Sequence, residues 1–276
     1  MQTFICQNKR LSYQKEGTGF PVVFIHGFPE DGNVWKHQIS FLKEKFTVIV
    51  PDLPGSGASA MLDETDSKEV TITDYADCIF ALLQHENIKD CLVFGHSMGG
   101  YITLALVEKY PHVIRGFGLV HSTAFADSDE KKKIRRKSIL TIGQYGSYAF
   151  IKSIVPGLFS AYFKQNYSAE IDTLMERGSN FQPAALQQYY TAMMLREDKT
   201  SVLKNTQLPV LFFMGKEDNA APLHDVLQQA HLPSISYIYI LEKSAHMGMW
   251  EEKEKVNKGL LDFIQDITAD QRLGKR

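Results

Sequence analysis

A serine between glycines, Ser97 in the sequence GHSMG of residues 95–99, is the residue of this chain best placed for nucleophilic chemistry. The apolar residues 91–94 precede it and indicate a buried strand, and a helical pattern over residues 100–110 follows it. A sharp turn between a strand and a helix pushes the serine hydroxyl out at the end of the sheet, beside the positive end of the helix dipole. This context predicts that Ser97 is a nucleophile.

A serine hydroxyl needs a base to take its proton, and His246 is the predicted base among nine histidines. Histidine suits this role because its reference pKa of about 6.5 lies close to neutral pH. His246 follows the last predicted strand, residues 235–241. Loops at the carboxyl ends of parallel strands are where ligands and catalytic groups gather in open α/β sheets.

The base in turn needs an acceptor on its other ring nitrogen, and Asp218 is the predicted one. It stands in a turn that follows the apolar residues 210–214 and precedes Pro222. Its neighbour Glu217 is the nearest rival, although adjacent side chains in a turn point in different directions. A helix N-cap ahead of Pro222 is the structural alternative for Asp218.

Acyl transfer also needs two hydrogen-bond donors for the oxyanion that forms on the attacked carbonyl. The backbone amide of Met98, at the start of the helix, is predicted to supply one. The amide of Phe28, in the loop after a buried strand, is predicted to supply the second, since Pro29 has no N–H and Gly27 gives the backbone room to turn.

The elements that must position these residues alternate along the chain. Apolar runs predict strands, and amphipathic patterns between them predict helices at residues 34–42, 74–84, 100–110, 223–230 and 252–264. Such alternation is typical of an α/β fold with a mainly parallel sheet and helices on both faces. The predicted strands cover residues 4–6, 11–13, 22–25, 47–50, 91–94, 117–120, 210–214 and 235–241.

The segment 123–205 breaks the alternation, because it has helix-forming residues but no clear strand. We expect a helical cap there, inserted between two parts of a core domain that comprises residues 1–122 and 206–276. Several aromatic and methionine side chains of the cap are predicted to line an apolar pocket, while Trp35 of the core lines the pocket or packs in the interior. The predicted substrate-binding residues are Trp35, Tyr145, Phe150, Phe159 and Met193.

Composition narrows the possible partners. The chain has 276 residues and a formal net charge of −2, which gives no reason to expect nucleic acid or an anionic membrane as a partner. It shows no signal-peptide pattern and no apolar run of about 18 residues, so a cytoplasmic protein is expected. The three cysteines show no paired spacing, and we expect them to be buried and reduced. No cluster has metal-ligand spacing. The oligomeric state is left open.

These motifs together make the chain resemble the α/β-hydrolase fold family with a helical cap. The resemblance extends over nearly the whole chain, and the order Ser97, Asp218, His246 is the order of that family. It implies an eight-stranded, mostly parallel sheet with the cap after the sixth strand. The matching stretches are HGFP at 26–29, DLPGSGAS at 52–59, GHSMGG at 95–100, GKEDNAAP at 215–222 and the loop around His246.

The resemblance also narrows the expected reaction. Haloalkane dehalogenases and epoxide hydrolases of this family carry aspartate where this chain has Ser97, which argues against both. The chain is therefore expected to be a cofactor-independent serine hydrolase, without a metal, that acts on a small to medium, largely apolar ester or related carbonyl compound. Hydrolysis of C–C bonds in vinylogous diketones stays open, as does a slowly hydrolysing ligand receptor of the same fold.

Some polar residues are expected to serve the structure. His26 and His96 should brace loops by hydrogen bonding, and His121, at the end of the sixth predicted strand, should be a satisfied buried residue more than a substrate contact. The basic residues 131–137 follow the acidic residues 127–130. This pattern favours a solvated cap helix with internal ion pairs, with attraction of an acidic substrate as the alternative.

Overall fold

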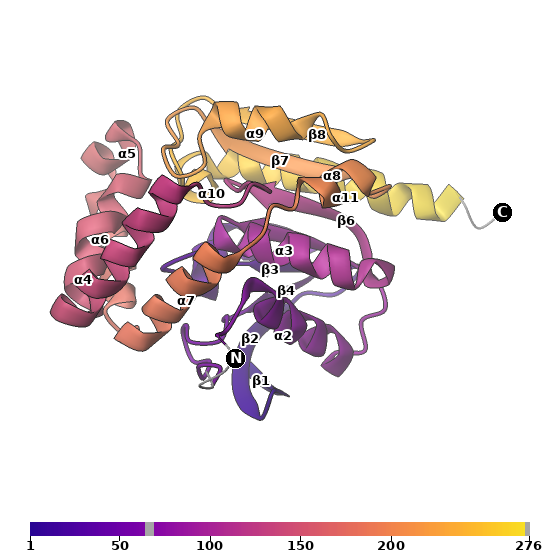
Figure 1. The fold of residues 1–276 in the computed structure, drawn as a ribbon. Helices are drawn as coiled ribbons and strands as arrows, with labels where there is room; N and C mark the ends of the chain where they lie inside the picture. Colours follow the sequence, from indigo (N-terminus) through magenta and orange to yellow (C-terminus); the bar gives the residue numbers. More distant parts are fainter. Residues whose placement is uncertain (64–68, 274–276) are drawn as a thin grey trace.

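A twisted sheet of eight strands forms the centre of the protein (Figure 1). The computed structural model describes residues 1–63 and 69–273. The strand order is β1-β2-β4-β3-β5-β6-β7-β8, in which β1 and β2 are antiparallel to their neighbours and the other strand pairs are parallel. The strands are β1 (Gln2–Cys6), β2 (Lys9–Glu16), β3 (Pro21–Ile25), β4 (Thr47–Pro51), β5 (Cys91–His96), β6 (Ile114–Val120), β7 (Val210–Gly215) and β8 (Ser236–Leu241).

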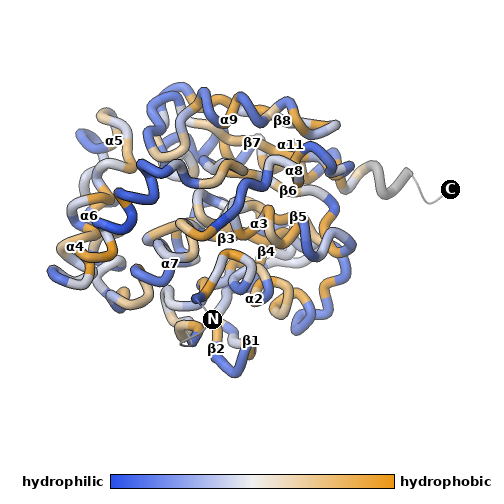
Figure 2. The backbone as a smooth tube through the Cα atoms, in the orientation of Figure 1, coloured by the Kyte–Doolittle hydropathy of each residue, from blue (hydrophilic) through white to orange (hydrophobic). Residues whose placement is uncertain are grey.

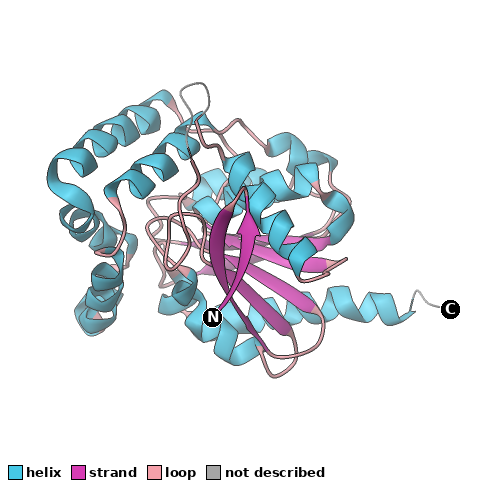
Figure 3. Cartoon of the chain, turned by 90° about the horizontal axis from the view of Figure 1, so that it is seen from below, coloured by secondary structure: helices cyan, strands magenta, loops and turns pink. Residues whose placement is uncertain are grey.

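Helices cover both faces of the sheet (Figure 3). Largely apolar sequences such as CLVFGH in β5 and VLFFMG in β7 are buried at every position, as strands between two helical layers must be. The hydropathy colouring shows the same pattern, with apolar residues along the central strands (Figure 2). The fold class is therefore the predicted one. The covering helices are η1 (Gly32–Trp35), α1 (Lys36–Leu42), α2 (Ile72–His85), α3 (Met98–Lys109), η2 (Pro111–Val113), α9 (Leu223–Ala230), α10 (Gly248–Glu251) and α11 (Lys253–Leu273).

Between β6 and β7 the chain leaves the core and forms a group of helices at its side (Figures 1 and 3). Helix α4 breaks at Gly146, whose φ of 79° and ψ of 171° are not helical, so α4 is two helices joined at a kink. We propose that this segment, residues 123–205, acts as a cap over the core. Its helices are α4 (Asp129–Ile154), η3 (Val155–Leu158), α5 (Ala161–Asn166), α6 (Ser168–Gly178), α7 (Pro183–Leu195) and α8 (Thr200–Asn205).

A buried ion cluster fastens the base of these helices. The fully buried carboxylate of Asp127 contacts Arg135 of α4 and, at 2.8 Å, Nη1 of Arg196 at the end of α7. The guanidinium of Arg135 also lies over the ring of Tyr190. The expectation of a solvated helix is therefore wrong for Arg135. The helical pattern showed that charges of both signs recur, but it could not show that Asp127 turns inward.

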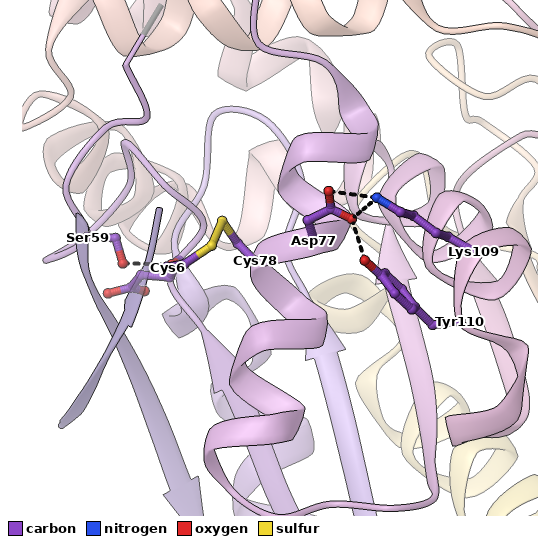
Figure 4. The surroundings of a disulfide bond; sticks show 7 residues. Cys6, Ser59, Asp77, Cys78, Lys109 and Tyr110 are labelled. Atoms are coloured by element: carbon purple, nitrogen blue, oxygen red, sulfur yellow. Dashed lines mark hydrogen bonds and ion pairs between the residues drawn. A yellow bond between two sulfur atoms is a disulfide. The ribbon is translucent and has the colours of Figure 1, made fainter. Parts of the chain in front are cut away.

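A disulfide joins Cys6 of β1 to Cys78 of α2 (Figure 4). The expectation that all three cysteines are reduced is wrong for this pair and right for Cys91, which is free and buried. The two bonded residues are 72 apart in sequence, and their Cα atoms come within 5.6 Å only because the edge strand β1 packs against α2. Spacing along the chain could not reveal that contact.

Within the described residues, every helix is too short or too polar to cross a membrane.

Candidate active site

The backbone at Ser97 is strained. Its φ of 50° and ψ of −114° lie outside the region that most residues adopt, between the end of β5 and the start of α3. Three hydrogen bonds hold this turn. The Ser97 amide donates to the carbonyl of Val120 at 3.0 Å, and the Ser97 carbonyl accepts from the Ser122 hydroxyl at 2.7 Å and from the Gly100 amide at 2.9 Å. The amide of Met98 opens helix α3.

Two glycines explain why the turn can be so tight. A Cβ at Gly95 would lie 2.1 Å from the carbonyl oxygen of Gly99, and a Cβ at Gly99 would lie 2.4 Å from that of Ile25. No side chain fits in either space, so the helix and the strands approach each other through glycine alone. The requirement for glycine on both sides of Ser97 is thus steric.

The loop that carries Phe28 lies against Ser97. A Cβ on Gly27 would come within 3.0 Å of the Ser97 Cβ, so the backbone that leads to the Phe28 amide passes directly beside the serine. The Gly27 amide donates to Oε2 of Glu30 at 2.8 Å, and this hydrogen bond holds the loop in place. The Phe28 ring packs on Tyr190 of α7, with 4.4 Å between ring centroids.

His246 and Asp218 are in direct contact at the carboxyl ends of β8 and β7. Nδ1 of His246 lies 2.8 Å from Oδ2 and 3.0 Å from Oδ1 of Asp218, and both side chains are nearly inaccessible. Because a carboxylate can only accept, Nδ1 carries the proton and Nε2 is the ring nitrogen that can take another. The amides of Ala220 and Ala221 also donate to Oδ1 of Asp218, at 2.8 and 2.9 Å. The rival Glu217 is exposed.

The surroundings set the protonation of this pair. Burial opposes ionisation of Asp218, but the charge and hydrogen bonds of His246 and His121 outweigh it and hold the pKa of the carboxyl well below its usual range. For His246, burial lowers the pKa, but the Asp218 carboxylate more than offsets this, so the pKa lies above the ordinary value. Such a pair keeps the acid ionised and gives a histidine that holds a proton more strongly than it would in water.

A second histidine shares the same carboxylate. Nδ1 of His121 donates to Oδ2 of Asp218 at 3.0 Å, and Nε2 of His121 accepts from the Gly248 amide at 3.2 Å. One nitrogen donates and the other accepts, so the ring is neutral. Burial lowers the pKa of His121 to about 4, in agreement with this. His121 is thus a fully buried, satisfied residue, as expected, but its contact with Asp218 was not foreseen.

His121, Asp218 and His246 also have the side-chain types and the spacing of a metal site, with potential ligand atoms within 4.8 Å of one another. The hydrogen bonds argue against that use. Both Nδ1 atoms need their protons to pair with the carboxylate, and metal binding would displace those protons.

The structure places the predicted substrate-binding residues in three different environments. Phe150, Phe159 and Met193 are buried within the cap, whereas Tyr145 is 63% exposed and Trp35 is fully buried in the core beside Phe24. Phe159 directly follows η3. The carbonyl of Leu158, the last residue of η3, accepts from the His246 amide at 2.9 Å. The Phe150 ring meets the Tyr190 ring edge-on at 5.8 Å.

Tyr145 therefore lies outside an enclosed apolar environment, and we leave it out of the proposed pocket. The helical pattern placed it in the cap but could not tell which face of the kinked helix α4 turns inward. Tyr190 was missed as an individual candidate, although it connects Phe28 to the cap.

The two bracing histidines make defined contacts. Nδ1 of His26 donates to the Gly27 carbonyl at 2.8 Å, and Nε2 accepts from the Leu53 amide at 3.0 Å. His96 joins Glu30 to the backbone of His246, with Nδ1 3.0 Å from Oε2 of Glu30 and Nε2 2.9 Å from the His246 carbonyl oxygen. Glu30 was missed by sequence reasoning. It carries no local signal in the sequence, because the charged Asp31 stands directly beside it.

Known proteins share this fold. The model of the alpha/beta hydrolase fold matches residues 21–145. A thermophilic esterase from Thermogutta terrifontis, solved with malate bound, superposes with a TM-score of 0.89 at 26% identity, over 96% of this chain and 97% of that one. The chain has the α/β-hydrolase fold.

Two curated relatives match this chain over almost the full length of both proteins. The uncharacterized hydrolase YugF of Bacillus subtilis is 24% identical over 92% of each chain. The (E)-2-((N-methylformamido)methylene)succinate hydrolase of Acinetobacter baylyi is 22% identical over 95% of this chain and 96% of its own. Both relatives are hydrolases by name, and only the second name states a substrate.

Proposed function

We propose that this protein is a cofactor-independent serine hydrolase that acts on a small to medium, largely apolar ester. The observation that carries the proposal is the strained backbone of Ser97, at the start of a helix and beside the Gly27–Phe28 loop, combined with the Asp218–His246 hydrogen bond. A nucleophile, a base with its orienting acid, and two backbone donors are the parts that acyl transfer requires.

In the proposed reaction, Nε2 of His246 takes the proton of Ser97 as the serine oxygen attacks the ester carbonyl. The amides of Met98 and Phe28 donate hydrogen bonds to the oxyanion that develops. His246 then gives its proton to the leaving alcohol, which leaves an acyl group on Ser97. Water, deprotonated by His246, attacks this acyl group and releases the acid, and the proton returns to Ser97.

We further propose that Phe150, Phe159 and Met193 form the apolar wall of the substrate pocket. Their support is burial in the cap, contact of Phe150 with the Phe28 loop through Tyr190, and the position of Phe159 next to the His246 backbone. Apolar side chains around a few polar groups are the usual lining of small-molecule sites.

The test is hydrolysis of p-nitrophenyl esters of increasing acyl length by the purified protein and by Ser97→Ala. We expect kcat of at least about 1 s⁻¹ on some ester. We expect Ser97→Ala to lower it on the order of 10⁶-fold. Retention of most of the turnover by Ser97→Ala would refute the proposal. Very slow turnover, together with ligand-dependent melting of the cap, would favour a ligand receptor.

The sequence and the disulfide point to different cellular compartments. The sequence predicts the cytoplasm, whereas the Cys6–Cys78 disulfide is typical of an oxidising compartment. We propose the cytoplasm on the sequence argument, so that Cys6 and Cys78 are thiols in the cell and form the disulfide when the protein is oxidised. Three free thiols in protein taken directly from cells would support this location, and one free thiol would contradict it.

A further inference from the structure

Glu30 and His96 form a buried pair that the proposed reaction does not use. Oε2 of Glu30 lies 3.0 Å from Nδ1 of His96, and neither side chain is exposed. The same oxygen accepts from the Gly27 amide at 2.8 Å. Nε2 of His96 lies 2.9 Å from the carbonyl oxygen of His246. One chain of hydrogen bonds therefore runs from the oxyanion loop, through the residue before Ser97, to the backbone of the base.

The partners fix the number of protons on His96. A carbonyl oxygen can only accept, so Nε2 must carry a proton. An ionised carboxylate can only accept as well, so Nδ1 must carry another, which makes the ring an imidazolium. His26 differs, because one of its nitrogens faces an amide donor.

The carboxylate has a reason to be ionised. Burial opposes the charge, but the contacts with His96 and the Gly27 amide hold the pKa of Glu30 below its ordinary value. Its second oxygen, Oε1, is buried without a hydrogen-bond partner among the described residues. A buried carboxylate with an unsatisfied oxygen is costly unless a cation lies beside it.

We propose that Glu30 and His96 are a buried ion pair that positions the oxyanion loop and the catalytic base relative to Ser97. The inference rests on the proposed function for its consequence, but the charge state of the pair can be measured without catalysis. Glu30 and His96 touch no substrate in this account. They act through Gly27 on the Phe28 amide, and through the His246 carbonyl on the base.

The geometry explains why this position matters. A Cβ on Gly27 would lie 2.9 Å from Nδ1 of His96, so the loop backbone and the His96 ring are in close contact. The His96 and His246 rings are 4.9 Å apart between centroids. A shift of the His96 ring would therefore displace both the Phe28 amide and His246 relative to Ser97.

The first test is the nitrogen NMR spectrum of the imidazole groups in protein labelled with ¹⁵N-histidine, at about pH 8, where a histidine in water is neutral. The contact of His96 with the Trp35 ring identifies its signals. We expect both ring nitrogens of His96 to be protonated. A neutral His96, with the shared proton on Glu30, would overturn the proposal. Neither result depends on hydrolysis, so failure here is distinct from failure of the proposed function.

The second test compares Glu30→Gln with Glu251→Gln. Glu251 is a half-buried glutamate of this region, and it accepts from the Ser244 hydroxyl and the Ala245 amide instead of a histidine. We expect Glu30→Gln to make His96 neutral and Glu251→Gln to leave both of its nitrogens protonated. If Glu30→Gln does not fold, the wild-type and Glu251→Gln spectra still decide.

The kinetic test concerns position. Where Glu30→Gln folds, we expect it to lower kcat on the order of 10²-fold, because misplacement of catalytic groups by about 1 Å has that effect. KM should stay nearly unchanged, since the pair does not contact substrate. Unchanged kcat in Glu30→Gln, with His96 made neutral, would overturn the positioning role.

Discussion

Oδ2 of Asp218 accepts a hydrogen bond from Nδ1 of His121 at 3.0 Å, in addition to the bond from His246. The acid of the proposed triad is therefore held from two sides. This second contact leads to a prediction that concerns stability.

His121→Leu should lower the free energy of unfolding by about 1–3 kcal/mol, because it leaves the buried Gly248 amide without an acceptor and removes one donor from Asp218. His121→Asn, which keeps a donor and an acceptor, is the matched control and should cost less. Urea denaturation of the three proteins measures the difference. Equal losses in both variants would show that shape, and not hydrogen bonding, is what His121 supplies.

Asp218→Asn should change the pH dependence of catalysis. His246 must be neutral to take the proton of Ser97, and its pKa lies above the ordinary value because the Asp218 carboxylate outweighs the effect of burial. The wild-type kcat/KM should thus rise with pH through that raised pKa. Without the carboxylate the pKa falls, so the rise should move to lower pH, while kcat drops roughly 10⁴-fold.

Glu217→Gln is the control for this experiment, since it removes an exposed carboxylate from the adjacent position. It should retain nearly wild-type kcat and pH profile. If Glu217→Gln loses activity as Asp218→Asn does, the wrong acid has been assigned.

The ion cluster at the base of the cap should be important for stability. Asp127→Asn leaves Arg135 and Arg196 without their carboxylate, and breaking a buried pair in this way costs about 3–5 kcal/mol. Glu108→Gln removes an exposed partner of Lys199 at the same base, and exposed pairs contribute only about 0–1 kcal/mol. Calorimetric melting curves compare the two. A loss in Asp127→Asn no greater than in Glu108→Gln would contradict the account.

The disulfide gives a prediction about thiols. The protein unfolded without reductant should react with a thiol reagent at Cys91 alone, and all three cysteines should react after reduction. Cys78→Ser should lower stability by about 2–4 kcal/mol, because the bond closes a long loop in the unfolded chain. Three reactive thiols before reduction would show that the bond does not form in the protein tested.

The strands could be predicted from sequence because each is a short apolar run, and β7, predicted at 210–214, is found at Val210–Gly215. Edges were harder. Strand β5 extends past Phe94 to His96, because pairing with β6 continues through residues that are not apolar. The final helix, predicted at 252–264, runs from Lys253 to Leu273, and its last turns are too polar to show a helical pattern.

The residues proposed for the chemistry lie where the chain carries a local signal. Ser97 stands between glycines, and Asp218 and His246 each follow a strand. Glu30 carries no such signal, because its partner His96 is 66 residues away and the contact depends on how two loops meet. The bond between Cys6 and Cys78 and the inward turn of Asp127 were missed for the same reason. Contacts between distant segments need the packed structure.

Covalent labelling by a fluorophosphonate probe, followed by mass spectrometry of the peptides, tests the central claim most directly. If Ser97 is the nucleophile and His246 its base, we expect a single adduct on Ser97, no adduct at that position in Ser97→Ala, and much slower labelling in His246→Gln. An adduct on another residue, or labelling of Ser97 at the same rate without His246, would contradict it.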